Sequence, residues 1–127
     1  MNDSASVPLA DQIEDRIDRA VRSGRVPQIV LDLDGTLFDN TPRTHAILRD
    51  AARDLYGADA PIVRQIDDME RAAFEYNPVD TLRKHGITDE DTLLAMREAW
   101  ADRFFGSDFL HHDLPLAGAE AAVGRWW

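Results

Sequence analysis

The sequence predicts a mostly α-helical chain that carries one short, buried β-strand. Apolar residues recur at helical spacing over most of the chain, and Pro and Gly residues mark the ends of these segments. One apolar run, residues 29–33, differs because it is short, rich in β-branched residues and bounded by Pro27 and Asp34-Gly35. Such a run is typical of a strand that is buried on both faces inside a parallel sheet. No partner strand is expected in this chain, so either the run is not a strand or the rest of its sheet is missing, and it should be poorly paired.

Five helices are expected before a loop at residues 106–115, and a sixth begins at Gly118. They cover residues 9–23, 42–56, 61–76, 78–85 and 89–105. Their periodic apolar positions give the expected buried faces: Leu9, Ile13, Ile17, Ala20 and Val21; Ile47, Leu48, Ala51, Ala52 and Leu55; Ile62, Ile66, Met69 and Ala73; Leu93, Met96, Trp100 and Phe104.

Polar residues mark where several of these helices begin. Thr41 is expected to be an N-cap residue with Pro42 in the first turn, and Asn77-Pro78 is expected to start the helix at residues 78–85. Thr88 is expected to cap the helix at residues 89–105, with Asp91 placed for a contact that resembles a capping box.

Length and composition indicate one soluble domain. The chain has 127 residues, which is the size of an ordinary domain, and a net charge of −10, which argues against nucleic acid or an anionic membrane as a partner. Its apolar runs are too short to span a membrane, and it has no cysteine for disulfide or thiolate chemistry. The amino-terminal residues lack the pattern of a signal peptide, so a cytoplasmic location is expected.

Two carboxylates stand where the expected strand ends. Asp32 and Asp34 are two residues apart, so on an extended chain their side chains point the same way. Such a pair can hold Mg²⁺, or can divide the work of phosphoryl transfer between a nucleophile and a proton carrier. Gly35 allows a tight turn, and Thr36 offers a hydroxyl and an amide to an anion such as phosphate.

The five residues Asp32-Leu33-Asp34-Gly35-Thr36 resemble motif I of the haloacid dehalogenase-like superfamily, most of whose members are Mg²⁺-dependent phosphatases. The resemblance implies that Asp32 is the nucleophile and forms an aspartyl-phosphate with a small phosphorylated substrate. It implies that Asp34 is the general acid and base, and that Thr36 helps to seat the pair. The Asp32 carboxylate and the Asp34 backbone carbonyl would bind Mg²⁺.

The resemblance extends over residues 26–127, and beyond motif I it is topological. It implies a Rossmann-like α/β core with an inserted helical cap, and residues 114–120 resemble the return from the cap into that core. The implied division is an N-terminal helix and link at 1–25, the first core strand and motif I loop at 26–41, the cap at 42–106, and a return segment at 107–127.

The later motifs of the family have no counterpart in this sequence. In the family these motifs supply a Ser or Thr, a lysine and an acidic pair. The only lysine here, Lys84, falls in the expected cap, and the acidic pair Asp67-Asp68 is expected to lie on the exposed face of a helix. We therefore expect the chain to be the N-terminal part of a longer protein, and to be inactive or nearly so alone. The carboxylates would repel a phosphate dianion that no cation offsets.

Two other interpretations stay open. The chain could be a non-catalytic helical interaction module or a relic fragment, because an Asp-rich sequence raises the chance of an accidental motif. Within the family, dehalogenase or phosphonatase chemistry is a weaker option. Asp34 argues against a dehalogenase, because the leaving group of a carbon–halogen bond needs no general acid, whereas that of a phosphate ester does. The substrate and the oligomeric state are not indicated.

A few further residues have side chains suited to binding or packing. Arg43, Arg71 and Arg83 are candidates to bind a substrate anion, and His111-His112 is expected to be exposed polar surface rather than a metal site. Four aromatic residues are expected to pack rather than to bind substrate: Trp100, Phe104, Phe105 and Phe109.

Overall fold

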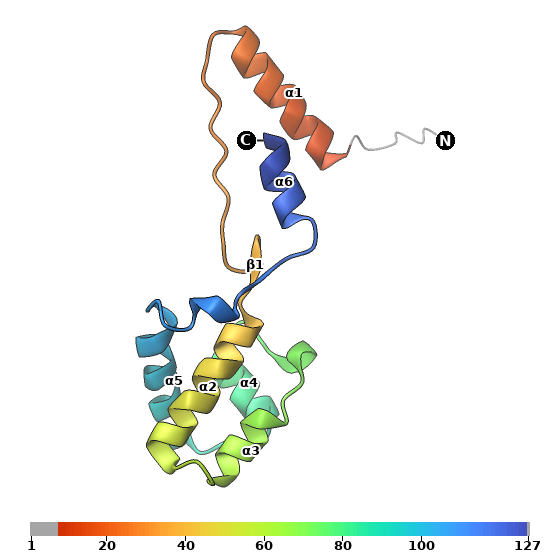
Figure 1. The fold of residues 1–127 in the computed structure, drawn as a ribbon. Helices are drawn as coiled ribbons and strands as arrows, with labels where there is room; N and C mark the ends of the chain where they lie inside the picture. The colour runs from red at the N-terminus through yellow and green to blue at the C-terminus, as the bar shows by residue number, and fades with distance from the viewer. Residues whose placement is uncertain (1–7, 127) are drawn as a thin grey trace, which may run out of the picture. The chain divides into compact units, whose positions relative to one another are not determined.

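The computed structural model describes residues 8–126. Within them the chain forms six α-helices and one small two-stranded sheet, so the predicted mostly helical character is confirmed (Figure 1). The chain divides between Leu31 and Asp32 into two compact units.

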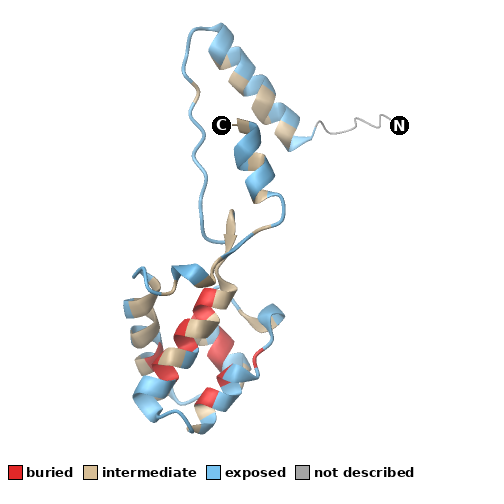
Figure 2. Cartoon of the chain, in the orientation of Figure 1, coloured by how far each residue is buried: buried red, intermediate tan, exposed pale blue. Residues whose placement is uncertain are grey.

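The first unit contains helix α1 (Leu9–Arg22), which confirms the helix expected at residues 9–23. It ends at Ser23 and Gly24, and Gly24 has a φ of +73°, a conformation that glycine adopts without strain. None of its residues is buried, and Leu9 and Val21 are 72% and 58% exposed (Figure 2). Its predicted apolar face therefore contributes to no core among the described residues.

The strand predicted at residues 29–33 is wrong. Residues 25–33 form no regular secondary structure, and Val30 is 92% exposed. A strand obtains its backbone hydrogen bonds from a neighbouring strand, and no described segment supplies that neighbour here. The apolar run is present, but the pairing that would make it a sheet is not.

The second unit contains a helical lobe, residues 41–104, made of four helices: α2 (Thr41–Tyr56), α3 (Pro61–Asp67), α4 (Pro78–Lys84) and α5 (Glu90–Phe104). Helix α2 packs against α3 and α5, and α4 packs against α5. The helix expected at 61–76 is shorter than predicted, because α3 ends at Asp67 and is followed by a 3₁₀ turn, η1 (Arg71–Ala73).

Local side chains fix where the helices of the lobe begin. Helix α4 begins after Asn77, as predicted, and the Asn77 side chain caps it by accepting a hydrogen bond of 3.0 Å from the Val79 amide. The predicted cap of α5 is wrong by one residue. Asp89, rather than Thr88, accepts hydrogen bonds from the Thr92 amide and hydroxyl, at 2.9 and 2.8 Å.

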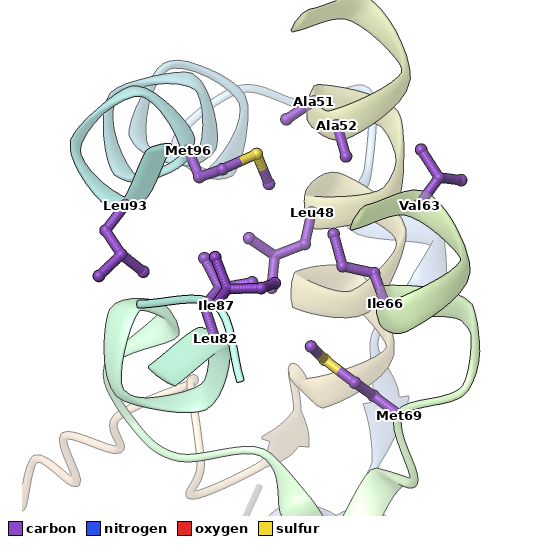
Figure 3. Packing of buried hydrophobic residues seen from close by; sticks show 10 residues of the cluster. All are labelled: Leu48, Ala51, Ala52, Val63, Ile66, Met69, Leu82, Ile87, Leu93 and Met96. Atoms are coloured by element: carbon purple, nitrogen blue, oxygen red, sulfur yellow. The ribbon is translucent and has the colours of Figure 1, made fainter. Parts of the chain in front are cut away.

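Buried side chains from all four helices meet in one core (Figure 3). The expected faces of α2 and α5 supply much of it, but Leu55 is 46% exposed, and Trp100 and Phe104 are only partly buried. Ile87, which follows α4, completes it. The members are Leu48, Ala51, Ala52, Val63, Ile66, Met69, Leu82, Ile87, Leu93 and Met96.

A short antiparallel ladder joins the two ends of the lobe. Strand β1 (Phe38–Asp39) precedes α2, and β2 (Leu114–Pro115) follows the 3₁₀ turn η2 (Leu110–His112). Phe38 lies opposite Pro115, and Asp39 lies opposite Leu114. The loop predicted at 106–115 therefore ends in a strand, and the chain enters and leaves the lobe side by side. Helix α6 (Ala119–Trp126) confirms the helix expected after Gly118.

Candidate functional site

The motif Asp32–Thr36 forms a turn that is held by its own backbone. The Leu33 carbonyl accepts hydrogen bonds from the amides of Thr36, Leu37 and Phe38, at 3.3, 3.0 and 2.9 Å. Gly35 has a φ of +74°, and its amide donates to the Phe38 carbonyl at 2.8 Å. A side chain at that position would be strained, so glycine is required by the turn and not only by a resemblance.

Asp34 is ion-paired with the first turn of α2. Its Oδ1 lies 2.7 Å from Nη2 of Arg43, a side chain that is only 4% exposed. The same guanidinium has its Nε 3.0 Å from Oδ1 of Asp113, and its carbon lies 4.0 Å from the centre of the Phe104 ring. Arg43 was a candidate for binding a substrate anion, but here two carboxylates and an aromatic face occupy it.

Asp113 is the functional neighbour that sequence reasoning missed. Burial raises the pKa of its carboxyl, and the negative charges of Asp34 and Asp39 add to this, while Arg43 opposes it. Nothing in the sequence marks it among eighteen aspartates, because its partner lies seventy positions away, at residue 43.

Asp39 anchors the start of α2 from the adjacent strand. Its Oδ1 accepts a hydrogen bond of 2.8 Å from the Thr41 amide, and its Oδ2 pairs with Arg71. Partial burial alone would raise the pKa of Asp39, but the hydrogen bonds from Arg71 and Thr41 outweigh it, and the pKa lies below its usual value. Thr41 is thus capped by Asp39 and does not itself act as the N-cap side chain.

The two predicted catalytic carboxylates have different surroundings. Asp32 is exposed, and its Oδ2 lies 3.4 Å from the Thr36 hydroxyl, at the long limit of a hydrogen bond. Asp34 lines the pocket described below, and it also lines a smaller hollow next to Phe38 and Asp113. Asp32 lines neither of them. That both carboxylates face one site therefore stays a prediction.

The oxygen donors at the motif fit part of a Mg²⁺ site. The Asp32 carboxylate and the Asp34 carbonyl are hard ligands of the kind Mg²⁺ prefers, but the Asp34 carboxylate is paired with Arg43. Within residues 8–126 no group of three or more acidic or histidine side chains is arranged to hold a metal ion. The other ligands would have to be water, substrate phosphate or groups supplied from elsewhere.

A pocket of about 560 Å³ opens between the motif and the helices of the lobe. Its size is within the range of small-molecule sites. Trp100, Phe104 and Phe105, expected only to pack, are part of its wall. The lining residues are Asp34, Asn40, Thr41, Thr44, Phe74, Glu75, Tyr76, Asn77, Pro78, Arg97, Trp100, Phe104 and Phe105.

The remaining candidate residues lie outside this pocket and have local partners. Arg83 contacts Glu90 at 3.1 Å, and Lys84 pairs with Glu75. The rings of His111 and His112 lie against each other, with centroids 4.1 Å apart. A second hollow of about 390 Å³, at Tyr56, Ile62 and Thr88 among others, contains no motif residue.

Comparisons with known proteins provide no family for this chain. No protein-family model, curated protein or solved structure matches it. The resemblance at residues 32–36 therefore depends on those residues and their surroundings alone. No helix within residues 8–126 is long and apolar enough to cross a membrane.

Proposed function

We propose that this chain supplies the nucleophile loop and the helical cap of a Mg²⁺-dependent phosphatase similar to the haloacid dehalogenase-like superfamily. The observation that carries the proposal is the Asp-Leu-Asp-Gly-Thr turn at the edge of the pocket, with the Asp34 side chain in its lining. The β1–β2 ladder supports it as well. A domain inserted into a core must enter and leave at one place, as this lobe does.

The proposed reaction has two steps. In the first, an Asp32 carboxylate oxygen attacks phosphorus, the ester P–O bond breaks, and Asp34 donates a proton to the departing oxygen. In the second, water attacks the aspartyl-phosphate, Asp34 accepts the proton from water, and the bond to Asp32 breaks to release phosphate. Because Arg43 occupies Asp34 Oδ1, that oxygen must leave the ion pair before it takes part.

The reaction needs positive charge beyond that of Arg43, whose guanidinium is already paired with Asp34 and Asp113. Bound Mg²⁺ would offset the electrostatic repulsion between the phosphate and the carboxylates. Lys84, the only lysine, is paired with Glu75. The proposal therefore requires a further lysine and acidic ligands from another polypeptide segment or a partner, and the 127 residues alone should be at least about 100-fold slower than the complete enzyme.

The test is phosphatase activity of the product of this gene, isolated from its own host with its intact mass recorded. We expect Mg²⁺-dependent hydrolysis of phosphate monoesters, removed by Asp32→Asn and by Asp34→Asn. Asp59→Asn is the matched control, because the exposed Asp59 has no ion pair within residues 8–126 and lies outside the motif.

Two results would contradict the proposal. Absence of hydrolysis by the host-made protein, with any ester and with Mg²⁺ present, would favour the non-catalytic helical module or relic fragment. Hydrolysis that survives Asp32→Asn would remove Asp32 as the nucleophile. Mg²⁺-dependent turnover by the purified 127-residue chain would instead overturn only the expectation that it is inactive alone.

A further inference from the structure

We infer that the pocket of about 560 Å³ binds an aromatic ring that carries an anionic substituent. The binding itself follows from the walls and charges of the pocket. That the ring belongs to the leaving group of a phosphate ester rests on the proposed function.

The walls of the pocket are unusually aromatic. Three of its rings, Trp100, Phe104 and Phe105, contact one another, with centroid separations of 4.5, 6.5 and 5.4 Å. Tyr76 is fully exposed, and Phe105 is 83% exposed. Large exposed aromatic side chains gathered around a hollow are typical of a binding site, and flat ligands gain stacking and edge contacts from them.

One cation at the pocket is available to an anion. The two carboxylates of the pocket each lie beside another cation, since Asp34 pairs with Arg43, which Asp113 shares, and Glu75 pairs with Lys84. Arg97 also lines the pocket, is exposed, and has no ion-pair partner within residues 8–126. A planar guanidinium of this kind binds a carboxylate through two parallel hydrogen bonds.

The position of Asp34 links the pocket to the proposed chemistry. As the proton donor to the leaving oxygen, Asp34 would contact the hydroxyl of the alcohol that is released. An alcohol with an aromatic ring and a carboxylate would then satisfy the three features of the pocket: the carboxylate of Asp34, the aromatic wall and Arg97. The inferred substrate class is the phosphate monoester of such an alcohol.

The test is binding of 4-(hydroxymethyl)benzoate to the 127-residue chain, followed by NMR through the indole N–H signal of Trp100. We expect a saturable shift of that signal. The saturated analogue, 4-(hydroxymethyl)cyclohexanecarboxylate, and benzyl alcohol should each bind about tenfold more weakly, because one lacks the ring and the other lacks the anion.

Matched variants locate the ligand. Arg97→Gln should weaken binding about tenfold, whereas Arg64→Gln, at an exposed arginine of α3 outside the pocket, should not. Phe105→Ala should weaken it about fivefold, and Leu55→Ala, at a half-exposed site of α2, should leave it unchanged. Circular dichroism of each variant shows whether the lobe stays folded, and only folded variants are compared.

Three outcomes would overturn the inference: no saturable shift, equal binding of the aromatic and saturated acids, or the same affinity for Arg97→Gln and Arg64→Gln. None of these measurements uses Mg²⁺, Asp32 or turnover. Binding as expected, together with a host-made protein that hydrolyses no ester, would keep the aromatic site and reject the phosphatase. Phosphatase activity without this binding would keep the proposed phosphatase and reject the aromatic site.

Discussion

Two apolar regions of this chain differ in how far their side chains are buried. In the helical lobe, the apolar faces of α2, α3, α4 and α5 close over a core in which Leu48 is fully buried. In residues 29–33, a short apolar run has no regular structure, and Val30 is almost fully exposed. Figure 2 shows the contrast, with buried residues confined to the lobe.

The difference is one of backbone hydrogen bonding, not of hydrophobicity. A helix satisfies its N–H and C=O groups within itself, so its apolar face needs only another side-chain surface. A strand must obtain those bonds from a second strand, and burying them unpaired costs more than the apolar contacts return. Within residues 8–126, apolar sequence therefore forms a core only in the helical lobe.

The largest expected effect contrasts a buried position with an exposed one. Leu48→Ala should destabilise the lobe by about 2–5 kcal/mol, because it removes buried contacts and leaves a cavity. Val30→Ala should change the free energy of unfolding by no more than about 0.5 kcal/mol. Urea unfolding followed by circular dichroism measures both. A comparable loss at Val30 would mean that the apolar run at residues 29–33 is buried in solution, and the two regions would then not differ.

A smaller effect is expected where the motif turn joins the lobe. Arg43→Met should cost about 2 kcal/mol, because it leaves the carboxylate of Asp113 partly buried without its cation. The control is Arg103→Met, whose partners Asp50 and Asp54 are half-exposed, and it should cost less than about 1 kcal/mol.

Adding Asp113→Asn to Arg43→Met should recover part of the loss, because the second change removes the unpaired charge. Thermal unfolding of the single and double variants measures the interaction energy between Arg43 and Asp113. Equal losses for Arg43→Met and Arg103→Met would show that the buried ion pairs do not hold this junction together.

The smallest expected effect depends on pH. The pKa of Asp39 is lowered in the folded chain, so Asp39 adds stability above the ordinary pKa of Asp, and this is lost as the pH falls through the lowered value. Asp39→Asn should therefore cost about 1 kcal/mol at about pH 7 and less at an acidic pH, where the carboxylate becomes protonated in the folded chain. Urea titrations at the two pH values measure this, with Asp59→Asn as the control. A cost that is independent of pH would mean that the stabilisation by Asp39 does not depend on the charge of its carboxylate.

The sequence alone predicted the features whose bonds close within a few residues. The positions of the helices, apart from the end of the one expected at 61–76, follow from apolar spacing and from the residues at helix ends. The start of α4 at Asn77-Pro78 and the glycine in the motif turn follow from the same local signals. The cap of α5 was misplaced by one residue, because Thr88 and Asp89 are both good N-cap residues and only their geometry chooses between them.

Tertiary structure decided what depends on residues far apart in the chain. The pairing of Arg43 with Asp113, the β1–β2 ladder and the aromatic pocket join positions tens of residues apart, and no local pattern encodes which of many charges or rings will meet. The failed strand at residues 29–33 has the same cause. Its β-branched composition is readable from the sequence, but a strand exists only where a second strand meets its backbone, and no described segment provides one.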